Sequence, residues 1–374
     1  MQELHFVRVM PWLVAMAACG LLFAAPTFAQ ESRPAGAAKW DQKLTEPYEQ
    51  WKPLKDVLQE LAARAGAEVA FAEETKATFM IPLPAGITLK DAVEKAAATC
   101  GFEAVIEGNQ VNVHKGGRIP GWAEMVGGRA VAVVEGNIRG GIYLPPNADA
   151  NRPIPWVWYA PNGLGPYHAW IARRLFEQGI AMASVNVGES QGNPAGRAIF
   201  TQFYQVLVTK HGLARKAVLF PQSRGGLMLY NWAAEHPDCV AAVGGIYPVC
   251  NPLSYPGLAT AAKAYGMTPE QFQEELPKNN PLDRLAPLAK AGIPIFHVHG
   301  DKDGTVPLEK NSGELEKRYK ALGGQVRVLV IPGLGHEGPE RGAPFFQCKE
   351  FVDFLIALAK AAAAALPASA PAVK

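Results

Sequence analysis

The sequence has few cysteines and no motif for a metal. Five of its 374 residues are cysteine, and no Cys-x-x-Cys pair or His/Cys cluster suggests a zinc site. The four cysteines after position 30 are Cys100, Cys239, Cys250 and Cys348. A chain of this length does not need a disulfide framework, so we interpret them as buried free thiols. We expect neither a metal nor another cofactor.

An excess of charge of one sign is also missing. The chain carries 36 Lys and Arg against 34 Asp and Glu, a net charge of +2, and it has no long basic run. Binding to the phosphate backbone requires clustered basic residues, so nucleic acid is excluded as a partner. With 49% hydrophobic and 19% charged residues, the composition is typical of a soluble globular protein. The length allows two domains.

No apolar run is long enough for a convincing membrane span, but the N-terminus has the pattern of a secretory signal. Arg8 precedes an apolar core at residues 12–25, and Thr27 and Ala29 place small residues before a cleavage site. We therefore expect residues 1–29 to be a signal peptide. The mature protein would be periplasmic or secreted from a bacterium, with no stable membrane insertion after cleavage.

A small α+β domain is predicted at residues 49–115, after a flexible lead-in at 30–48. Leu54, Val57, Leu58 and Leu61 fall on one helical face, and Thr88 can cap a second helix. Strands are expected at 68–71 and, as an edge strand because of a proline, at 79–83. A hairpin is expected from 102–106 and 111–114 around Gly108.

This order of elements resembles the short N-terminal domain of secretins and TonB-dependent receptors. The resemblance is carried by PLKDVLQELAARAGAEVAFAEE and GITLKDAVEKAAATCGFEAVIEGNQVNV. It implies a non-catalytic module that binds a cell-envelope protein or component, and it fits export to a periplasm. A structural appendage with no partner is the alternative, because a domain type does not establish a binding site.

A second domain is predicted at residues 122–364, after a Gly-rich linker, and residues 365–374 are expected to be disordered. Its strands alternate with helices, which predicts a doubly wound, mostly parallel α/β sheet covered on both faces, opened by an antiparallel pair. The expected strands are 130–135, 140–144, 155–160, 180–187, 217–220, 240–247, 294–299 and 326–331. The expected helices are 168–178, 200–211, 227–236 and 345–361.

Ser223 stands where an apolar strand ends and a helix begins. Gly225 and Gly226 follow it, as in the nucleophile elbow of α/β-hydrolases, where a strained turn exposes a serine hydroxyl. Pro221 replaces the first glycine of the Gly-x-Ser-x-Gly pattern and must lie where the strand needs no N–H donor. The alternative is a strand-to-helix junction with an inert serine.

Two later segments supply the partners of a catalytic serine in the order that this fold requires. Residues 299–307, HGDKDGTVP, resemble the His-Gly-x-x-Asp-x-x-Val-Pro segment that carries the triad acid, which places the acid at Asp303, with Asp301 as the alternative. The turn before His336 resembles the Gly-x-Gly-His turn of the catalytic base. A solvated turn and a structural histidine are the alternatives.

An oxyanion hole needs two backbone donors. One is expected to be the N–H of Arg224, after the nucleophile. The other should follow the third strand, where Pro161 has no N–H, so Asn162 or Gly163 is the candidate.

Residues 125–360 as a whole resemble secreted bacterial α/β-hydrolases of the prolyl-oligopeptidase and dienelactone-hydrolase branch. The most specific segments are SRGGLMLYNWAAEHPDCVAAVGGIYPVCNPLSYPG and NPLDRLAPLAKAGIPIFHVHGDKDGTVP. The resemblance implies a serine hydrolase with a lid-like insertion at about 250–293. Trp170, Tyr247 and Tyr255 could line its pocket, but core positions are favoured for such aromatic side chains.

The expected reaction is hydrolysis of a carboxylic ester, on a small molecule or a glycan, through an acyl-enzyme on Ser223. A serine peptidase would use the same triad and is one alternative. The pair Ser223-Arg224 is similar to that of glucuronoyl esterases, which suggests a carbohydrate-linked ester. A catalytically inactive envelope-binding protein is the third alternative.

Overall fold

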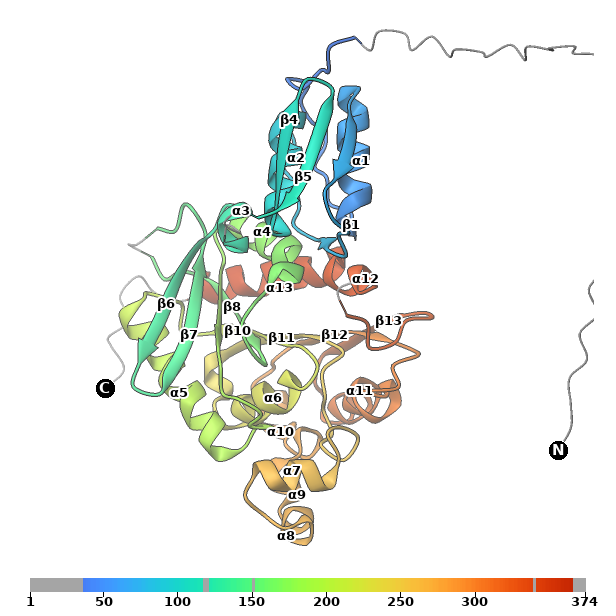
Figure 1. The fold of residues 1–374 in the computed structure, drawn as a ribbon. Helices are drawn as coiled ribbons and strands as arrows, with labels where there is room; N and C mark the ends of the chain where they lie inside the picture. The colour runs from blue at the N-terminus through green and yellow to red at the C-terminus, as the bar shows by residue number, and fades with distance from the viewer. Residues whose placement is uncertain (1–35, 117–120, 150–151, 339–340, 366–374) are drawn as a thin grey trace, which may run out of the picture. The chain divides into compact units, whose positions relative to one another are not determined.

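The computed structural model describes residues 36–116, 121–149, 152–338 and 341–365 (Figure 1). The expected signal peptide and the predicted tail beyond residue 365 lie outside these ranges, as does most of the predicted linker. From Ala37 onward, the described residues group into one compact unit. None of the helices within the described ranges combines the length and apolar character that a transmembrane helix requires.

Residues 37–115 have a hydrophobic core of their own, built by the apolar faces of two helices and the strands beside them. The elements are β1 (Lys52–Pro53), α1 (Leu54–Ala65), β2 (Glu68–Phe71), β3 (Thr78–Phe79), α2 (Leu89–Thr99), β4 (Phe102–Glu107) and β5 (Gln110–Lys115). Thr88 Oγ1 accepts from the Asp91 N–H and caps α2, as its position predicts. β4 and β5 pair as the expected antiparallel hairpin, and β2 joins β5 in parallel.

The expected strand at 79–83 is shorter in the structure. Only Thr78–Phe79 forms β3, which pairs with β1, and Leu83 makes an isolated bridge to Tyr48. Pro82 and Pro84, with Leu83 between them, have no N–H, so the chain here cannot sustain a continuous ladder.

An eight-stranded sheet forms the centre of the rest of the chain (Figure 1). Its order is β13-β12-β11-β10-β8-β9-β7-β6. β6 and β7 form an antiparallel pair and β7 runs antiparallel to β9, while all other neighbours are parallel. The strands are β6 (Arg129–Glu135), β7 (Ile138–Leu144), β8 (Trp156–Ala160), β9 (Ala181–Val185), β10 (Ala217–Pro221), β11 (Val240–Ile246), β12 (Ile295–Gly300) and β13 (Val326–Ile331). The predicted mostly parallel sheet is confirmed.

Helices cover both faces of this sheet, and strand side chains alternate between the two layers. Trp156 and Trp158 of β8 pack toward one layer, and Val157 and Tyr159 toward the other. The first layer contains α5 (Pro194–Lys210), α6 (Gly225–Glu235), α10 (Ala286–Lys290) and α11 (Ser312–Ala321). The second contains α3 (Trp122–Met125), α4 (Ala169–Glu177), α12 (Ala343–Phe346) and α13 (Lys349–Ala364).

The segment at 250–293 is mostly helical. It contains α7 (Leu258–Ala264), α8 (Pro269–Glu274) and α9 (Leu276–Asn279) before α10. Thr268 and Gln271 form a capping box at the start of α8, with Pro269 at the first helical position. Ala261, Ala262, Phe272 and Leu276 give the segment a small apolar core.

Several helices differ from expectation. The expected helix at 345–361 is split in the structure into α12 and α13, with Gln347 and Cys348 between them. The short helices α3, α7, α9 and α10 have no predicted counterpart. α5 starts at Pro194 rather than near residue 200, because Asn193 caps it and Pro194 suits its first turn. α11 is absent from the predicted elements. Its sequence is strongly polar, and Leu315 and Tyr319 are its only buried apolar residues, too few to produce a clear hydrophobic period.

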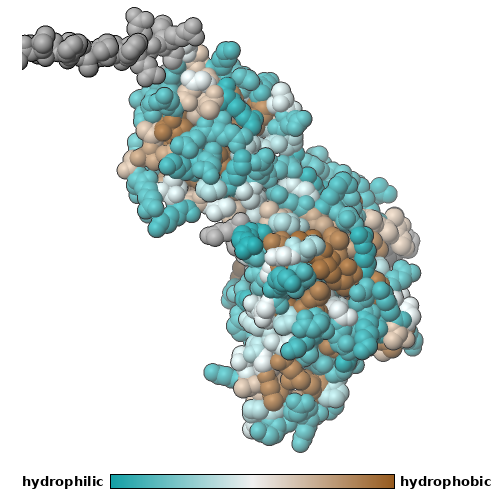
Figure 2. All heavy atoms as spheres, turned by 90° about the vertical axis from the view of Figure 1, so that its right-hand side faces the viewer, coloured by the Kyte–Doolittle hydropathy of each residue, from teal (hydrophilic) through white to brown (hydrophobic). Residues whose placement is uncertain are grey.

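β13 is an edge strand of the sheet, and Val330 on it is 39% exposed. Figure 2 looks at the side of the molecule where β13 lies in Figure 1 and shows an apolar patch within a mostly hydrophilic face.

Candidate active site

Ser223 lies at the sharp turn between β10 and α6. Its φ is +50°, a left-handed conformation that a residue with a side chain rarely adopts. The two glycines behind it are required by close packing. A Cβ on Gly225 would overlap the Ala160 carbonyl, and one on Gly226 would overlap the Val249 carbonyl. The chain therefore builds the strained elbow that the sequence predicts.

Pro221 is the last residue of β10 and lies in a gap of the ladder. β10 pairs with β11 up to Leu219, and the pairing resumes only at the bridge between Gln222 and Ile246. On the other side, the Gln222 N–H donates to the Ala160 carbonyl and maintains the contact with β8. The missing N–H of Pro221 thus falls where its pairing with β11 is already interrupted.

The structure brings Ser223, His336 and Asp303 together. Ser223 Oγ lies 2.9 Å from His336 Nε2, and His336 Nδ1 lies 2.8 Å from Asp303 Oδ2. The carboxylate can only accept, so Nδ1 carries the proton and Nε2 is free to accept from the serine hydroxyl. This is the tautomer that a general base toward Ser223 requires.

Asp303 is fixed by the loop that follows β12. Its Oδ1 accepts from the N–H groups of Thr305 at 3.0 Å and Val306 at 2.7 Å, and its side chain is fully buried. Burial alone would raise the pKa of Asp303, but the hydrogen-bond donors around the carboxylate, led by His299 and His336, lower it below its ordinary value. Asp303 therefore stays ionised at neutral pH.

Asp301, the alternative acid, has a different role. Its Oδ1 accepts from the Gly333 N–H, and this hydrogen bond stabilises the turn that precedes His336. Gly333 has a φ of +77°, which lets this turn carry His336 back over the elbow. The His336 ring packs on Tyr247, with 4.3 Å between ring centroids.

A cavity of about 230 Å³ opens at Ser223, lined mostly by polar side chains. Its lining comprises Tyr159, Pro161, Asn162, Tyr167, Gln222, Ser223, Arg224, Tyr247, His336, Glu337 and Gly338. Asn162 therefore faces the nucleophile, whereas Gly163 lines another cavity beside β6 and β7. Within the described ranges, the N–H groups of Arg224 and Asn162 donate to no protein acceptor. This leaves both amides available to a ligand.

The Arg224 side chain lies at the rim of the elbow, held from two loops. Its Nε is 2.9 Å from a carboxylate oxygen of Glu189. The Asn162 amide, with its oxygen turned toward the guanidinium, accepts from Nη2 at 2.8 Å.

The three aromatic residues considered for the pocket lie in different places, and only one of them lines the cavity at Ser223. Tyr247 lines the cavity although it is almost fully buried, so the expected core position describes it only in part. Trp170 lies in the core and donates to Glu49. Tyr255 packs on a small cluster of Leu227, Val249 and Val306, and no residue of the 250–293 segment lines the cavity.

Sequence reasoning missed the polar cluster beneath Ser223. Gln222 Oε1 accepts from Tyr159 at 2.9 Å and lies 3.2 Å from His168 Nε2, and Gln222 Nε2 donates to Tyr247 at 3.2 Å. Burial lowers the pKa of His168 to about 3, so its ring is neutral. The signal available in the sequence was the glutamine itself, a polar residue between a buried strand and the elbow.

Within the described part of the chain, no group of three or more His, Cys, Asp or Glu residues could hold a metal ion.

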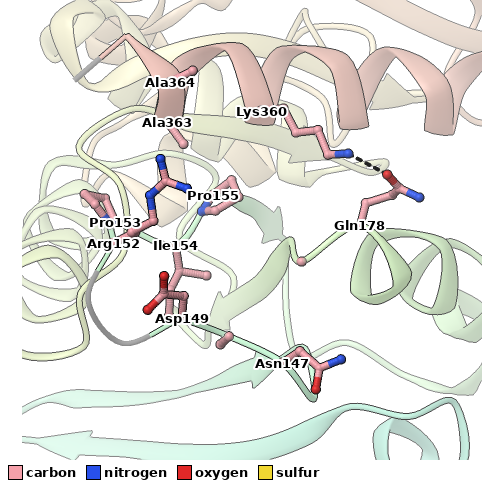
Figure 3. Close-up of a pocket in the computed structure, with 12 residues that line it drawn as sticks. Asn147, Asp149, Arg152, Pro153, Ile154, Pro155, Gln178, Lys360, Ala363 and Ala364 are labelled. Atoms are coloured by element: carbon pink, nitrogen blue, oxygen red, sulfur yellow. Dashed lines mark hydrogen bonds between the residues drawn. The ribbon is translucent and has the colours of Figure 1, made fainter. Parts of the chain in front are cut away.

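A separate cavity of about 370 Å³ lies at the amino end of β8 (Figure 3). In Figure 3, Lys360 of α13 reaches Gln178, and Arg152 lies across the opening from Asn147. Ser223 lies at the carboxyl end of the neighbouring β10, and the two cavities share no residue. The second cavity therefore lies at the amino ends of the parallel strands, and the cavity at Ser223 lies at their carboxyl ends.

Comparison with known proteins identifies the architecture. No model of a protein family matches the sequence, and no curated protein matches it. Several solved structures match the fold. A puromycin-hydrolysing peptidase of Mycobacterium tuberculosis has a TM-score of 0.53 at 16% identity, over 66% of this chain and 43% of that chain. An acylaminoacyl peptidase of Pyrococcus horikoshii has 0.51 at 17%, over 68% and 48%. Dipeptidyl peptidase 4 of Porphyromonas gingivalis has 0.51 at 14%, over 62% and 35%.

The chain has the α/β-hydrolase fold. It spans less than half the length of each of these three structures, so the likeness concerns the fold alone. In an α/β-hydrolase sheet, functional side chains gather at the carboxyl ends of the strands, and Ser223, Asp303 and His336 follow β10, β12 and β13 in that order.

Proposed function

We propose that this protein is a serine hydrolase that cleaves carboxylic esters through an acyl-enzyme. The observation that carries the proposal is the hydroxyl of Ser223, held at a strained elbow 2.9 Å from the free nitrogen of a histidine that a buried carboxylate orients.

In the acylation step, Ser223 Oγ bonds to the ester carbonyl carbon and its proton passes to His336 Nε2. The carbonyl oxygen becomes the anion of a tetrahedral intermediate. When the bond to the alcohol oxygen breaks, Nε2 returns the proton to the leaving alkoxide. Water then repeats the sequence on the acyl-enzyme, which releases the acid and restores the Ser223 hydroxyl.

Asp303 and two backbone amides stabilise the charges that form. The carboxylate balances the transient imidazolium of His336. The N–H groups of Arg224 and Asn162 serve as the oxyanion hole, because both lie on residues that line the cavity and neither is used within the described protein. Gly163 is not favoured as the second donor, since it lines a different cavity.

The size and lining of the cavity favour a small or polar acyl group. The cavity of about 230 Å³ is smaller than the pockets of roughly 300–1,000 Å³ that hold drug-sized ligands. Phenol hydroxyls, amides and a guanidinium can bind hydroxyl groups, but they leave little apolar wall for a long hydrocarbon chain. These features support a polar ester, and a carbohydrate-linked ester belongs to this class.

The experiment is a comparison of the mature protein with Ser223→Ala on short p-nitrophenyl esters and on a fluorophosphonate probe. We expect turnover and a covalent label on Ser223 in the parent protein, and neither in the variant. Undiminished turnover by a folded Ser223→Ala protein would exclude the mechanism.

A serine peptidase is the second candidate, because the three solved structures above are named as peptidases. The same triad could cleave an amide, with His336 protonating the leaving amine. Chromogenic dipeptide amides separate the two activities, since hydrolysis of amides with poor turnover of esters favours the peptidase.

An inactive envelope-binding protein is the third candidate, with residues 49–115 as the binding module. The paired triad argues against it, because an unused serine and histidine have no need of this geometry. Absence of any label on a folded protein would favour it.

A further inference from the structure

A chain of buried polar side chains runs inward from Asp303. Tyr230 Oη lies 2.7 Å from His297 Nε2, and His297 Nδ1 lies 2.9 Å from Ser312 Oγ. The same hydroxyl lies 2.8 Å from His299 Nδ1. Tyr230 is 2% exposed, and His297, His299 and Ser312 are fully buried. The proposed reaction uses none of them.

The direction of each hydrogen bond follows from the partners. His299 Nε2 lies 2.8 Å from the Val306 carbonyl and 3.4 Å from Asp303 Oδ2, and both can only accept, so Nε2 carries a hydrogen. In an imidazole with its hydrogen on Nε2, Nδ1 is the acceptor, and the Ser312 hydroxyl can donate to it.

The rest of the chain then has one arrangement. Ser312 Oγ has given its only hydrogen to His299, so it accepts from the Nδ1–H of His297. His297 Nε2 is left as an acceptor for the Tyr230 hydroxyl. Every donor in the chain points toward Asp303, and neutral hydrogen bonds aligned in this way polarise one another.

His299 meets the loop of the catalytic acid at two points. Its Nε2–H holds the Val306 carbonyl, while the N–H of Val306 holds Asp303 Oδ1. The same Nε2–H faces Asp303 Oδ2, the oxygen that accepts from His336. One ring therefore fixes the turn of the loop and places a dipole on the working oxygen of the carboxylate.

We propose that His299, oriented by Ser312, is a positioning residue of the triad that sets the basicity of His336 through Asp303. The proposal rests on the proposed hydrolase function, since it assigns a role toward the same triad. It makes Ser312, at the start of α11, the link between the catalytic loop and the buried His297.

A pH profile can detect this role. The His299 dipole offsets part of the negative charge of Asp303, and that charge favours the protonated form of His336. Without the dipole, His336 is expected to hold its proton to a higher pH. The acid limb of the pH profile is the low-pH range in which the rate of the Ser223 reaction falls because His336 is protonated. This limb should then move to higher pH. A residue that only fills space would leave the limb in place and lower the rate by one factor at every pH.

Other titratable groups surround this cluster within the described residues. They are His297 and Tyr230 behind Ser312, Cys250 and Tyr319 near Tyr230, and Tyr247 and Glu337 beside Asp303 and His336. Burial lowers the pKa of His297 to about 3 and raises the pKa of Tyr247 above its usual range. Neither of these two residues changes charge near neutral pH, and Glu337 is present unchanged in every variant below.

The experiment measures the rate of fluorophosphonate labelling of Ser223 from pH 5 to 9 in the full chain. The variants are His299→Leu, His299→Gln and Ser312→Ala, with thermal unfolding as the check of folding. Glutamine can place an amide N–H near the position of the imidazole Nε2–H, whereas leucine cannot. His114→Gln is the control, because His114 is exposed on β5, outside the triad and its network.

We expect the acid limb of His299→Leu to rise by roughly half to one pH unit, which lowers labelling below the limb roughly three- to tenfold. Ser312→Ala should shift it less in the same direction, and His299→Gln should restore it. An unmoved limb in folded His299→Leu and Ser312→Ala proteins would overturn the proposal. If the His299→Leu protein fails to fold, the Ser312→Ala limb decides. A parent protein that does not label overturns the hydrolase function, which separates the two failures.

Discussion

The carbonyl oxygen of Ala160 occupies the position where a side chain on Gly225 would begin. Ala160 ends β8 and Gly225 begins α6, so this contact brings the helix against the neighbouring strand directly behind Ser223. The backbone of Ala160 also accepts from the Gln222 N–H at 3.0 Å. The Ala160 carbonyl thus bonds to Gln222 before Ser223 and packs against Gly225 after it, which leaves no room for a methyl group on residue 225.

Gly225→Ala should destabilise the fold and displace Ser223. Overpacking of a rigid site costs about 1–3 kcal/mol, and here the clash is with backbone that cannot rotate away. We expect lower stability to chemical denaturation and a loss of fluorophosphonate labelling. Gly163→Ala is the matched control, because a Cβ at that position meets no atom within 4 Å. Equal stability of the two variants would contradict the packing argument.

If the proposed function holds, Asp303→Asn should lower acyl-enzyme formation by about 10⁴-fold, the size of the loss in a serine protease whose triad aspartate becomes asparagine. The amide can donate to His336 Nδ1, which favours the wrong tautomer and leaves Nε2 protonated toward Ser223. The rate of Ser223 labelling measures this effect. Asp301→Asn, which alters only the brace on Gly333, should label within a fewfold of the parent. Similar losses in both variants would place the acid in doubt.

The stability contributed by Asp303 should depend on pH. Its pKa in the folded protein lies below the ordinary value of 3.8, so the folded state keeps the carboxylate charged where the unfolded chain takes up a proton. This contribution is fully present above the unfolded pKa and is lost as pH falls through the folded pKa. The difference in unfolding free energy between the parent and Asp303→Asn should therefore narrow from pH 6 toward pH 3. If this difference in unfolding free energy stays constant between pH 6 and pH 3, ionised Asp303 does not stabilise the folded protein.

Much of the architecture could be predicted because most of its elements have a local signal. The hairpin at Gly108 and the cap at Thr88 depend on residues within a few positions of one another. The central strands of the sheet, β8 to β12, are buried on both faces and read as apolar runs. α11 has no such signal, because its polar surface masks the two residues that hold it.

The meeting of Ser223, His336 and Asp303 could be predicted for the same reason, whereas the contacts around these residues could not. Ser223, Asp303 and His336 each follow a strand of the parallel part of the sheet. The carboxyl ends of parallel strands lie at the same end of the sheet, so the three loops meet there. The contact of Arg224 with Glu189 depends on how two loops fold, and no sequence pattern around either residue indicates that the two side chains pair. The ladder gap at Pro221 likewise depends on a register with β11 that spacing does not reveal.

Reducing agent should not change the thermal stability of the protein. Cys100, Cys239, Cys250 and Cys348 are all free thiols in the structure, but only Cys250 is buried and the other three are partly exposed, so the expected burial is wrong for those three. Cys250 is fully buried, and burial raises the pKa of its thiol well above the usual range, so it should resist alkylation until the protein unfolds. Mass spectrometry after alkylation of native and denatured protein tests this. A reductant-sensitive melting temperature, or labelling of native Cys250, would contradict it.

Asn193 links the start of α5 to the 250–293 segment, and two substitutions can separate its roles. Its Oδ1 accepts from the Gly196 N–H at 2.8 Å as a helix cap, while its Nδ2 donates to the Ala264 carbonyl at 2.6 Å. Asn193→Ala removes both bonds, and Asn193→Asp keeps the cap but loses the donor. Loss of an N-cap costs about 1 kcal/mol, and a carboxylate facing a carbonyl oxygen adds repulsion. We expect both variants to be less stable than the parent, with proteolysis within α7 enhanced in each. Protection of α7 in Asn193→Asp equal to that of the parent would show that the helix cap alone holds this segment.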